Sequence, residues 1–222
     1  MEKLSIKECF SFAWQTFKSR PWIFIQAGLL LFLINMAVNL LQTLAEMGGK
    51  QMGEPAMAII GLVSAIIGIG ISFLISMGET AFFLRSHDDV HAVSLRTLWN
   101  PTPFWKFVGV SLLTAICILI GLVFLIVPGI ILGILFMFVG YLVIEEKLGP
   151  IDAMKKSIAL TKGNRIQLFL LSLAVLGINI LGFLALLVGL FVSIPVSFLM
   201  MVHAYRTLSR TGQAEVLVPE AV

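Results

Sequence analysis

Charged residues are scarce in this sequence. Asp, Glu, Lys and Arg make up only 12% of its 222 residues, against about 25% in an average soluble domain. Hydrophobic residues make up 59%, and the mean hydropathy is +1.04. This composition argues against a water-soluble enzyme, a disordered regulator and a nucleic-acid-binding protein. It predicts an integral membrane protein that has no nucleic-acid partner.

Cysteines and catalytic motifs are equally sparse. The two cysteines, Cys9 in a polar segment and Cys117 in an apolar one, form neither a disulfide framework nor a Cys-x-x-Cys site. The sequence contains no His-Glu-x-x-His, Gly-x-Ser-x-Gly or phosphate-binding loop. His87 and His91 have the spacing of metal ligands on a helix, but no further ligand lies near them in sequence. We therefore expect no catalytic residues, no metal and no cofactor.

Four stretches of the chain carry no charge at all. They are residues 21–45, 55–78, 107–144 and 166–202. A span needs about 20 helical residues, so each of the first two crosses the membrane once. The last two are nearly twice as long, and Pro128 and Pro195 are expected to break each into a pair of helices. The basic residues among the first twenty argue against a cleavable signal peptide, so the first apolar stretch is expected to remain as a span.

The distribution of basic residues favours six spans over four. With six spans, the segments on one side are 1–20, 79–106, 145–165 and the part from His203 onward. These segments contain every Lys and Arg of the chain except Lys50. Cytoplasmic loops carry the excess of Lys and Arg, so this side and both termini are predicted to be cytoplasmic. Four spans would export the basic residues between Lys147 and Arg165.

A short amphipathic segment precedes each predicted pair of spans. The first begins at Ser5, which forms a capping box with Glu8. The second is residues 89–99, and the third begins at Pro150, a favoured first residue of a helix. The predicted fold is an all-α integral membrane protein of six transmembrane helices, arranged as three hairpins, each preceded by a cytoplasmic interfacial amphipathic helix. Residues 1–211 form one domain, and 212–222 form a short cytoplasmic tail.

Residues 128–164 carry a recognisable pattern: Pro-Gly opens a span, two acidic residues end it, and a polar motif follows. The matching residues are Pro128, Gly129, Glu145, Glu146, Ala153, Ser157, Leu160, Lys162, Gly163 and Asn164. This pattern resembles a prokaryotic membrane family that includes the membrane domain of some glycerophosphoryl diester phosphodiesterases and stand-alone proteins of unknown function. The resemblance implies a six-helix bundle in the prokaryotic cytoplasmic (inner) membrane and no settled activity. The part of the chain after the last span is too short for a catalytic domain.

A polar stripe runs along the first span. Asn35, Asn39, Gln42 and Glu46 recur at spacings of three and four residues, so they share one helix face. Such side chains either join helices by hydrogen bonds or line a water-filled vestibule, and we favour the first interpretation.

One carboxylate stands at the edge of an apolar stretch. Glu79 directly follows the second span, and Arg85 lies further along the chain. Ionisable groups inside a membrane are costly and usually functional. At an interface, however, a carboxylate beside a cation is ordinary, and we favour that interpretation for Glu79.

A cluster of basic residues follows the fourth span. Lys155, Lys156, Lys162 and Arg165 lie beside an apolar helix face, an arrangement that suits anionic lipid headgroups. The preferred function is a non-catalytic membrane protein whose basic cytoplasmic rim engages anionic lipid or a membrane partner, which includes a second copy of the chain. The alternative is a small-solute permease or channel that uses the polar stripe as its vestibule.

The predicted topology can be tested by cysteine labelling. A cysteine introduced at Gly49 should react with a membrane-impermeant reagent added from outside, because this loop is predicted to be external. A cysteine introduced at Lys155 should not react until the membrane is opened. External labelling at position 155 would contradict the six-span topology.

Overall fold

The computed structural model describes residues 4–99, 103–185 and 189–217. This part of the chain is all-helical and contains no strand. The elements are α1 (Ile6–Ser19), α2 (Pro21–Met52), α3 (Glu54–Asp88), the 3-10 helix η1 (Leu95–Leu98), α4 (Phe104–Phe124), α5 (Ile126–Leu135), α6 (Val139–Glu146), α7 (Pro150–Thr161), α8 (Arg165–Leu184) and α9 (Leu190–Leu217).

Six helical stretches in the described part are long and apolar enough to cross a membrane, as many as the sequence predicts. They are Pro21–Lys50, Glu54–Asp88, Phe104–Phe124, Ile126–Glu146, Arg165–Leu184 and Leu190–Arg210. A water-free bilayer core requires each backbone polar group to bond within the protein, and helices of this length achieve that internally.

Local sequence explains where several helices begin and end. Ser5 caps α1, and its side chain accepts a hydrogen bond from the Glu8 amide at 3.4 Å, as the capping box predicts. Gly53 joins α2 to α3 with a φ of 95°, a conformation that suits glycine. Pro21 and Pro150 occupy the first turns of α2 and α7, where a missing amide costs nothing.

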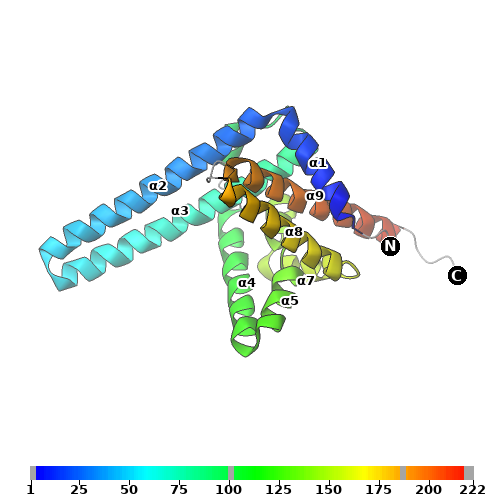
Figure 1. Cartoon of the computed structure of the whole chain (residues 1–222). Helices are drawn as coiled ribbons and strands as arrows, with labels where there is room; N and C mark the ends of the chain where they lie inside the picture. The colour runs from blue at the N-terminus through cyan, green and yellow to red at the C-terminus, as the bar shows by residue number, and fades with distance from the viewer. Residues whose placement is uncertain (1–3, 100–102, 186–188, 218–222) are drawn as a thin grey trace.

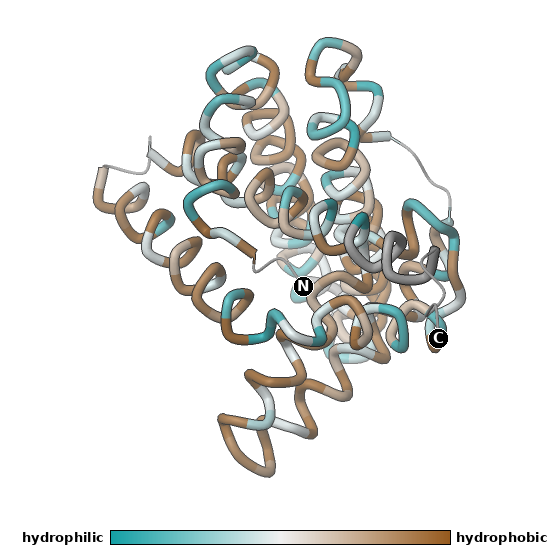
Figure 2. Tube along the Cα trace, turned by 90° about the vertical axis from the view of Figure 1, so that its right-hand side faces the viewer, coloured by the Kyte–Doolittle hydropathy of each residue, from teal (hydrophilic) through white to brown (hydrophobic). Residues whose placement is uncertain are grey.

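Several helices that follow one another in sequence pack as pairs, among them α2 with α3, α4 with α5, and α8 with α9. α2 and α3 lie along each other and project away from the other helices, and α4 and α5 form a second projecting pair (Figure 1). The end of the α4–α5 pair is coloured largely hydrophobic in Figure 2. Val123 there is 86% exposed and Ile126 is 70% exposed. Such a surface fits a lipid environment far better than water.

The core lies where α1, α3, α6, α7 and α9 meet. Its largest fully buried side chains include Phe82 of α3, Leu142 of α6 and Tyr205 of α9. α1 packs along α9 and buries Cys9, Ala13 and Phe17. The far ends of the projecting pairs contribute little to this core, which contains buried residues from the other end of α2, α3 and α4.

The fourth candidate span, Ile126–Glu146, is not one continuous helix. α5 ends at Leu135, a turn covers residues 136–138, and α6 begins at Val139. The Ser157 hydroxyl of α7 donates a hydrogen bond to the Leu135 carbonyl at 2.7 Å. A carbonyl at the end of a helix needs such a partner where water is excluded, so α7 stabilises this break.

The first long apolar stretch breaks close to its proline, whereas the second does not break at its proline. Leu125, in extended conformation, separates α4 from α5, and Pro128 lies in the first turn of α5. Pro195 lies inside α9, which begins at Leu190. The prediction that Pro195 marks the second break is therefore wrong, since a proline one turn into a helix removes only one backbone hydrogen bond.

The prediction of a second amphipathic helix over residues 89–99 is also wrong for most of these residues. α3 continues to Asp88, and only Leu95–Leu98 forms a short 3-10 helix. The Asp89 carboxylate accepts hydrogen bonds from the backbone amides of His91 and Ala92. This side chain stabilises a turn in competition with a helix.

The predicted boundary at 211–212 is not marked by a helix end, since α9 runs to Leu217. Residues 218–222 lie outside the described part.

Gly78 allows η1 to approach α3 closely, which gives a test of this packing. A Cβ at Gly78 would overlap the Leu98 backbone carbonyl, whereas a Cβ at Gly70 would meet nothing within 4 Å. Gly78→Ala should therefore destabilise the protein by about 1–3 kcal/mol, as overpacking does. Gly70→Ala, on the same helix, should be neutral or slightly stabilising because alanine favours helix. Thermal unfolding in detergent measures both, and equal melting temperatures would contradict the described packing.

Candidate functional site

An apolar cavity lies between α2, α3 and α9. Its volume is about 440 Å³, within the roughly 300–1,000 Å³ that small-molecule sites occupy. Five phenylalanines contribute to its wall: Phe24, Phe32, Phe82, Phe83 and Phe191. Phe24, Phe82 and Phe83 belong to the buried core, while Phe32 is exposed. The cavity is therefore anchored on the rigid core and open at the side of α2.

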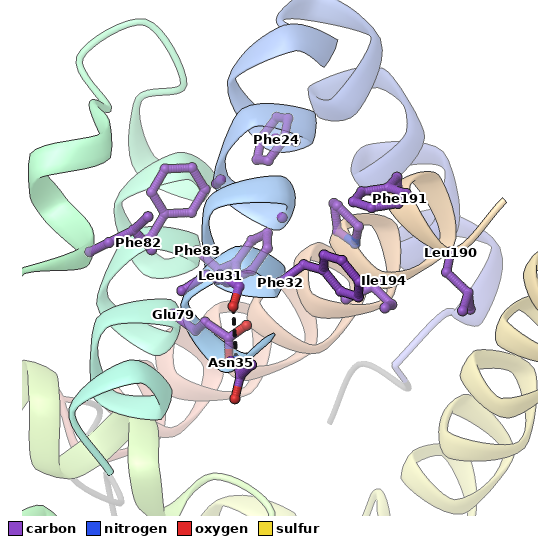
Figure 3. Close-up of a pocket in the computed structure, with 14 residues that line it drawn as sticks. Phe24, Leu31, Phe32, Asn35, Glu79, Phe82, Phe83, Leu190, Phe191 and Ile194 are labelled. Atoms are coloured by element: carbon purple, nitrogen blue, oxygen red, sulfur yellow. Dashed lines mark hydrogen bonds between the residues drawn. The ribbon is translucent and has the colours of Figure 1, made fainter. Parts of the chain in front are cut away.

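Two polar side chains enter this apolar cavity. They are Glu79 of α3 and Asn35 of α2, which lie at the same end of the cavity in the view of Figure 3. The Asn35 amide donates a hydrogen bond to the Leu31 carbonyl of its own helix at 2.9 Å. Among the described residues, no donor is bonded to the Glu79 carboxylate, and no cation pairs with it. The interpretation of Glu79 as half of an interfacial ion pair is thus unsupported.

The polar stripe of α2 does not act as one unit. Asn35 and Asn39 are exposed and bond backward to carbonyls of their own helix, at 2.9 and 2.8 Å. Gln42 lies over Gly68 and donates to the Ser64 carbonyl of α3 at 3.4 Å. Glu46 is exposed. Only Gln42 therefore bonds to another helix, while Asn35 alone reaches the cavity.

The four predicted basic residues are in different situations. The Lys156 ammonium pairs with the Glu146 carboxylate, 2.6 Å from each oxygen, so its charge is neutralised locally. Lys155, Lys162 and Arg165 are exposed. The structure brings Lys162 and Arg165 together around a surface hollow, and Lys155 and Lys156 are not part of its lining.

The hollow, which we call the α8 hollow, is lined by Lys162, Gly163, Arg165, Ile166 and Gln167. Gly163 has a φ of 85°, a conformation that suits glycine, and turns the chain between α7 and α8. The first amides of a helix have no partner inside it, and they attract anions. Asn164 does not cap α8, because its side-chain oxygen accepts a hydrogen bond from the Leu4 amide at 3.1 Å.

A charged junction joins α3, α6 and α9. Arg206 pairs with Asp88 of α3 at 2.5 Å and with Glu145 of α6. Glu145 also accepts a hydrogen bond at 2.6 Å from the hydroxyl of Tyr205, a fully buried residue. A cavity of about 500 Å³ borders this junction and is lined mostly by charged residues. Its charges are largely paired with one another, which indicates that the junction holds the three helices together.

His87 contacts His203, and not His91 as its sequence spacing suggests. Its Nε2 lies 3.1 Å from Nδ1 of His203 in α9, and the Phe12 ring packs against both imidazoles. His91, by contrast, contributes its carbonyl as an acceptor for Arg20. No group of three or more His, Cys, Asp or Glu side chains suited to a metal occurs among the described residues.

Cys9 has the character of a core residue. It is 1% exposed, and burial, with a smaller contribution from the nearby Glu8 charge, raises the pKa of its thiol to about 11. The thiol is therefore protonated at neutral pH, whereas a nucleophilic cysteine has a lowered pKa.

Sequence reasoning missed the junction and the cavity for one reason: both depend on contacts between residues far apart in the chain. Arg206 and Glu145 are 61 positions apart, and no local spacing signals their pairing. For Glu79 a signal existed, because it directly follows an apolar stretch. Its apolar surroundings become visible only when α2 and α9 pack beside α3.

Comparison with known proteins gives a family and no activity. Residues 54–221 match the family described as "Domain of unknown function (DUF7847)". The chain is similar to uncharacterised proteins of Mycobacterium bovis and of two strains of Mycobacterium tuberculosis, each 32% identical over 132 residues. The match covers 59% of this chain and 40% of each relative, so the chain spans less than half the length of these relatives. No solved structure matches, and no link to glycerophosphoryl diester phosphodiesterases is found.

The charged junction can be tested by removing its cation. Arg206→Met leaves the Asp88 and Glu145 carboxylates without their partner and should cost about 2–4 kcal/mol, between the values for exposed and buried pairs. Lys156→Met removes one half-exposed pair and should cost about 1 kcal/mol or less. Thermal unfolding of both variants in one detergent provides the comparison. Equal losses would show that Arg206 does not hold the three helices together.

Proposed function

The chain belongs to the DUF7847 family, and we propose that it is a non-catalytic multi-pass membrane protein that binds anionic lipid through its basic cytoplasmic rim. The observation that carries this proposal is the α8 hollow, where Lys162 and Arg165 flank the start of α8. A lipid phosphate placed there meets two cations and the positive end of a helix. The structure favours a narrower site than the sequence predicted, because Lys156 is already paired with Glu146.

The proposed orientation places the hollow at the right depth for a headgroup. The basic residues of the chain, apart from Lys50, gather on one predicted side, which we assign to the cytoplasm together with both termini. In this orientation the six helices cross the inner membrane as three hairpins, and α1 and α7 lie at the interface. α8 then enters the bilayer directly from the hollow, with Ile166, 73% exposed, facing the acyl chains.

Lipid is preferred to a protein partner because the surface around the hollow is open and carries both requirements of a lipid site. Lys162 and Arg165 supply charge, and the neighbouring Ile166 supplies apolar contact. The resemblance to the membrane domain of some glycerophosphoryl diester phosphodiesterases remains a prediction, and it would fit a protein that works among phospholipids.

The alternative function, a small-solute permease or channel, has one supporting observation. Asn35, the innermost residue of the polar stripe, reaches the cavity that contains Glu79. Asn39 and Glu46 face outward from the bundle, so the stripe does not continue as the lining of this cavity. A pathway across the membrane would need polar groups at successive depths, and this arrangement favours a local site.

Neutralising the α8 hollow should weaken anionic lipid binding. The double variant Lys162→Gln/Arg165→Gln should lower the affinity for phosphatidylglycerol about 30-fold, since each basic residue contributes about 1 kcal/mol. Phosphatidylcholine retention should not change. Native mass spectrometry of the detergent-solubilised protein with each lipid measures both affinities.

The matched control is Lys7→Gln/Lys155→Gln. It removes the same total charge from two exposed lysines outside the hollow, and it should weaken binding less than about threefold. An equal loss in the control would place the binding in the general charge of the rim. Equal retention of the two lipids by the unmodified protein would refute anionic lipid recognition altogether.

A further inference from the structure

The α2–α3–α9 cavity combines features that the proposed function does not use. It is far more apolar than a headgroup site, yet it holds one carboxylate that lacks a partner among the described residues. The cavity lies among α2, α3 and α9, which are all candidate spans. Ionisable residues among membrane-spanning helices are costly and are usually functional.

The charge of Glu79 calls for a counter-ion. A carboxylate in apolar surroundings is costly to keep ionised unless a cation compensates it. No Lys or Arg among the described residues pairs with Glu79, and Lys156 and Arg206 pair with other carboxylates. A bound molecule with a positive charge would satisfy this requirement.

The aromatic wall reinforces the preference for a cation. Phenylalanine faces carry negative electrostatic potential and attract ammonium groups, most strongly where water is excluded. Phe32 and Phe191 contact each other edge to face, with ring centroids 6.4 Å apart, at the α2–α9 side of the cavity. Phe24 and Phe83 stack at 6.1 Å on the core side. A ligand inside the cavity is therefore surrounded by rings on two sides.

The opening of the cavity indicates how a ligand enters. Phe32 and Ile194 lie at its rim and are 57% and 42% exposed, so the rim faces the surrounding lipid. The volume of about 440 Å³ accommodates one compact apolar chain with a small head. Asn35 beside Glu79 offers a carbonyl oxygen to the same head, since its amide nitrogen is already bonded to Leu31.

We propose that this cavity binds a single-chain cationic amphiphile, with its ammonium group at Glu79 and Asn35 and its apolar chain among the phenylalanines. The site is separate from the α8 hollow, which is lined by other residues and carries positive charge. Binding at one site can therefore fail without affecting the other.

The test compares two probes with the same tail, dodecyltrimethylammonium and dodecanol. Each is titrated into the purified full chain in a neutral maltoside detergent, and binding is followed by the rise in melting temperature at matched mole fractions. The unmodified protein should bind the ammonium probe at least tenfold more tightly than the alcohol. Glu79→Gln should abolish this difference and leave alcohol binding unchanged. Glu46→Gln, which neutralises an exposed carboxylate of α2, should behave like the unmodified protein.

A second variant tests the location without touching the charge. A Cβ at Gly28 would lie 3.5 Å from the Phe191 ring, so Gly28→Leu fills the cavity from α2. This variant should lose both probes. Unchanged ammonium binding in either Glu79→Gln or Gly28→Leu would overturn the proposal. Equal binding of the two probes by the unmodified protein, or selective binding of a two-chain amine lipid in place of the single-chain probe, would overturn it as well.

Discussion

Arg206 joins three helices that are distant in sequence. It pairs with Asp88 at the end of α3 and with Glu145 at the end of α6, while its neighbour Tyr205 is fully buried and bonds to the same Glu145. Charges are unfavourable in a bilayer core, and these carboxylates lie at the ends of α3 and α6. The packed core forms at that end of the molecule, where charged pairing and aromatic burial reinforce each other.

This concentration of packing leaves the other ends of the helices free to face lipid. The α2–α3 and α4–α5 pairs extend away from the core (Figure 1). They expose apolar side chains along most of their length. Without a hydrophobic driving force between helices in lipid, such pairs depend on close backbone contacts and a few hydrogen bonds. The bond from Gln42 to Ser64 over Gly68 is one of these. The α2–α3–α9 cavity lies where the α2–α3 pair meets α9.

The two candidate sites differ because their surroundings differ. At the α8 hollow, Lys162 and Arg165 are exposed on the surface of the protein. At the cavity, Glu79 is enclosed mostly by phenylalanines and aliphatic side chains, so its charge requires a specific counter-ion. The two sites therefore suit amphiphiles of opposite charge.

The sequence alone determined the features that depend on local composition. Apolar stretches of sufficient length predict six candidate spans, and the Ser5–Glu8 capping box and Pro150 predict where α1 and α7 begin, because these signals act within a few residues. Tertiary structure decided the rest. Asp89 turns the chain where an amphipathic helix was predicted, and α9 continues through Pro195. Glu146 neutralises Lys156, and α2 and α9 enclose Glu79. Some of these outcomes depend on a partner that only folding brings close, and the others depend on a competition between local structures. Sequence spacing gives no information about the energy of either.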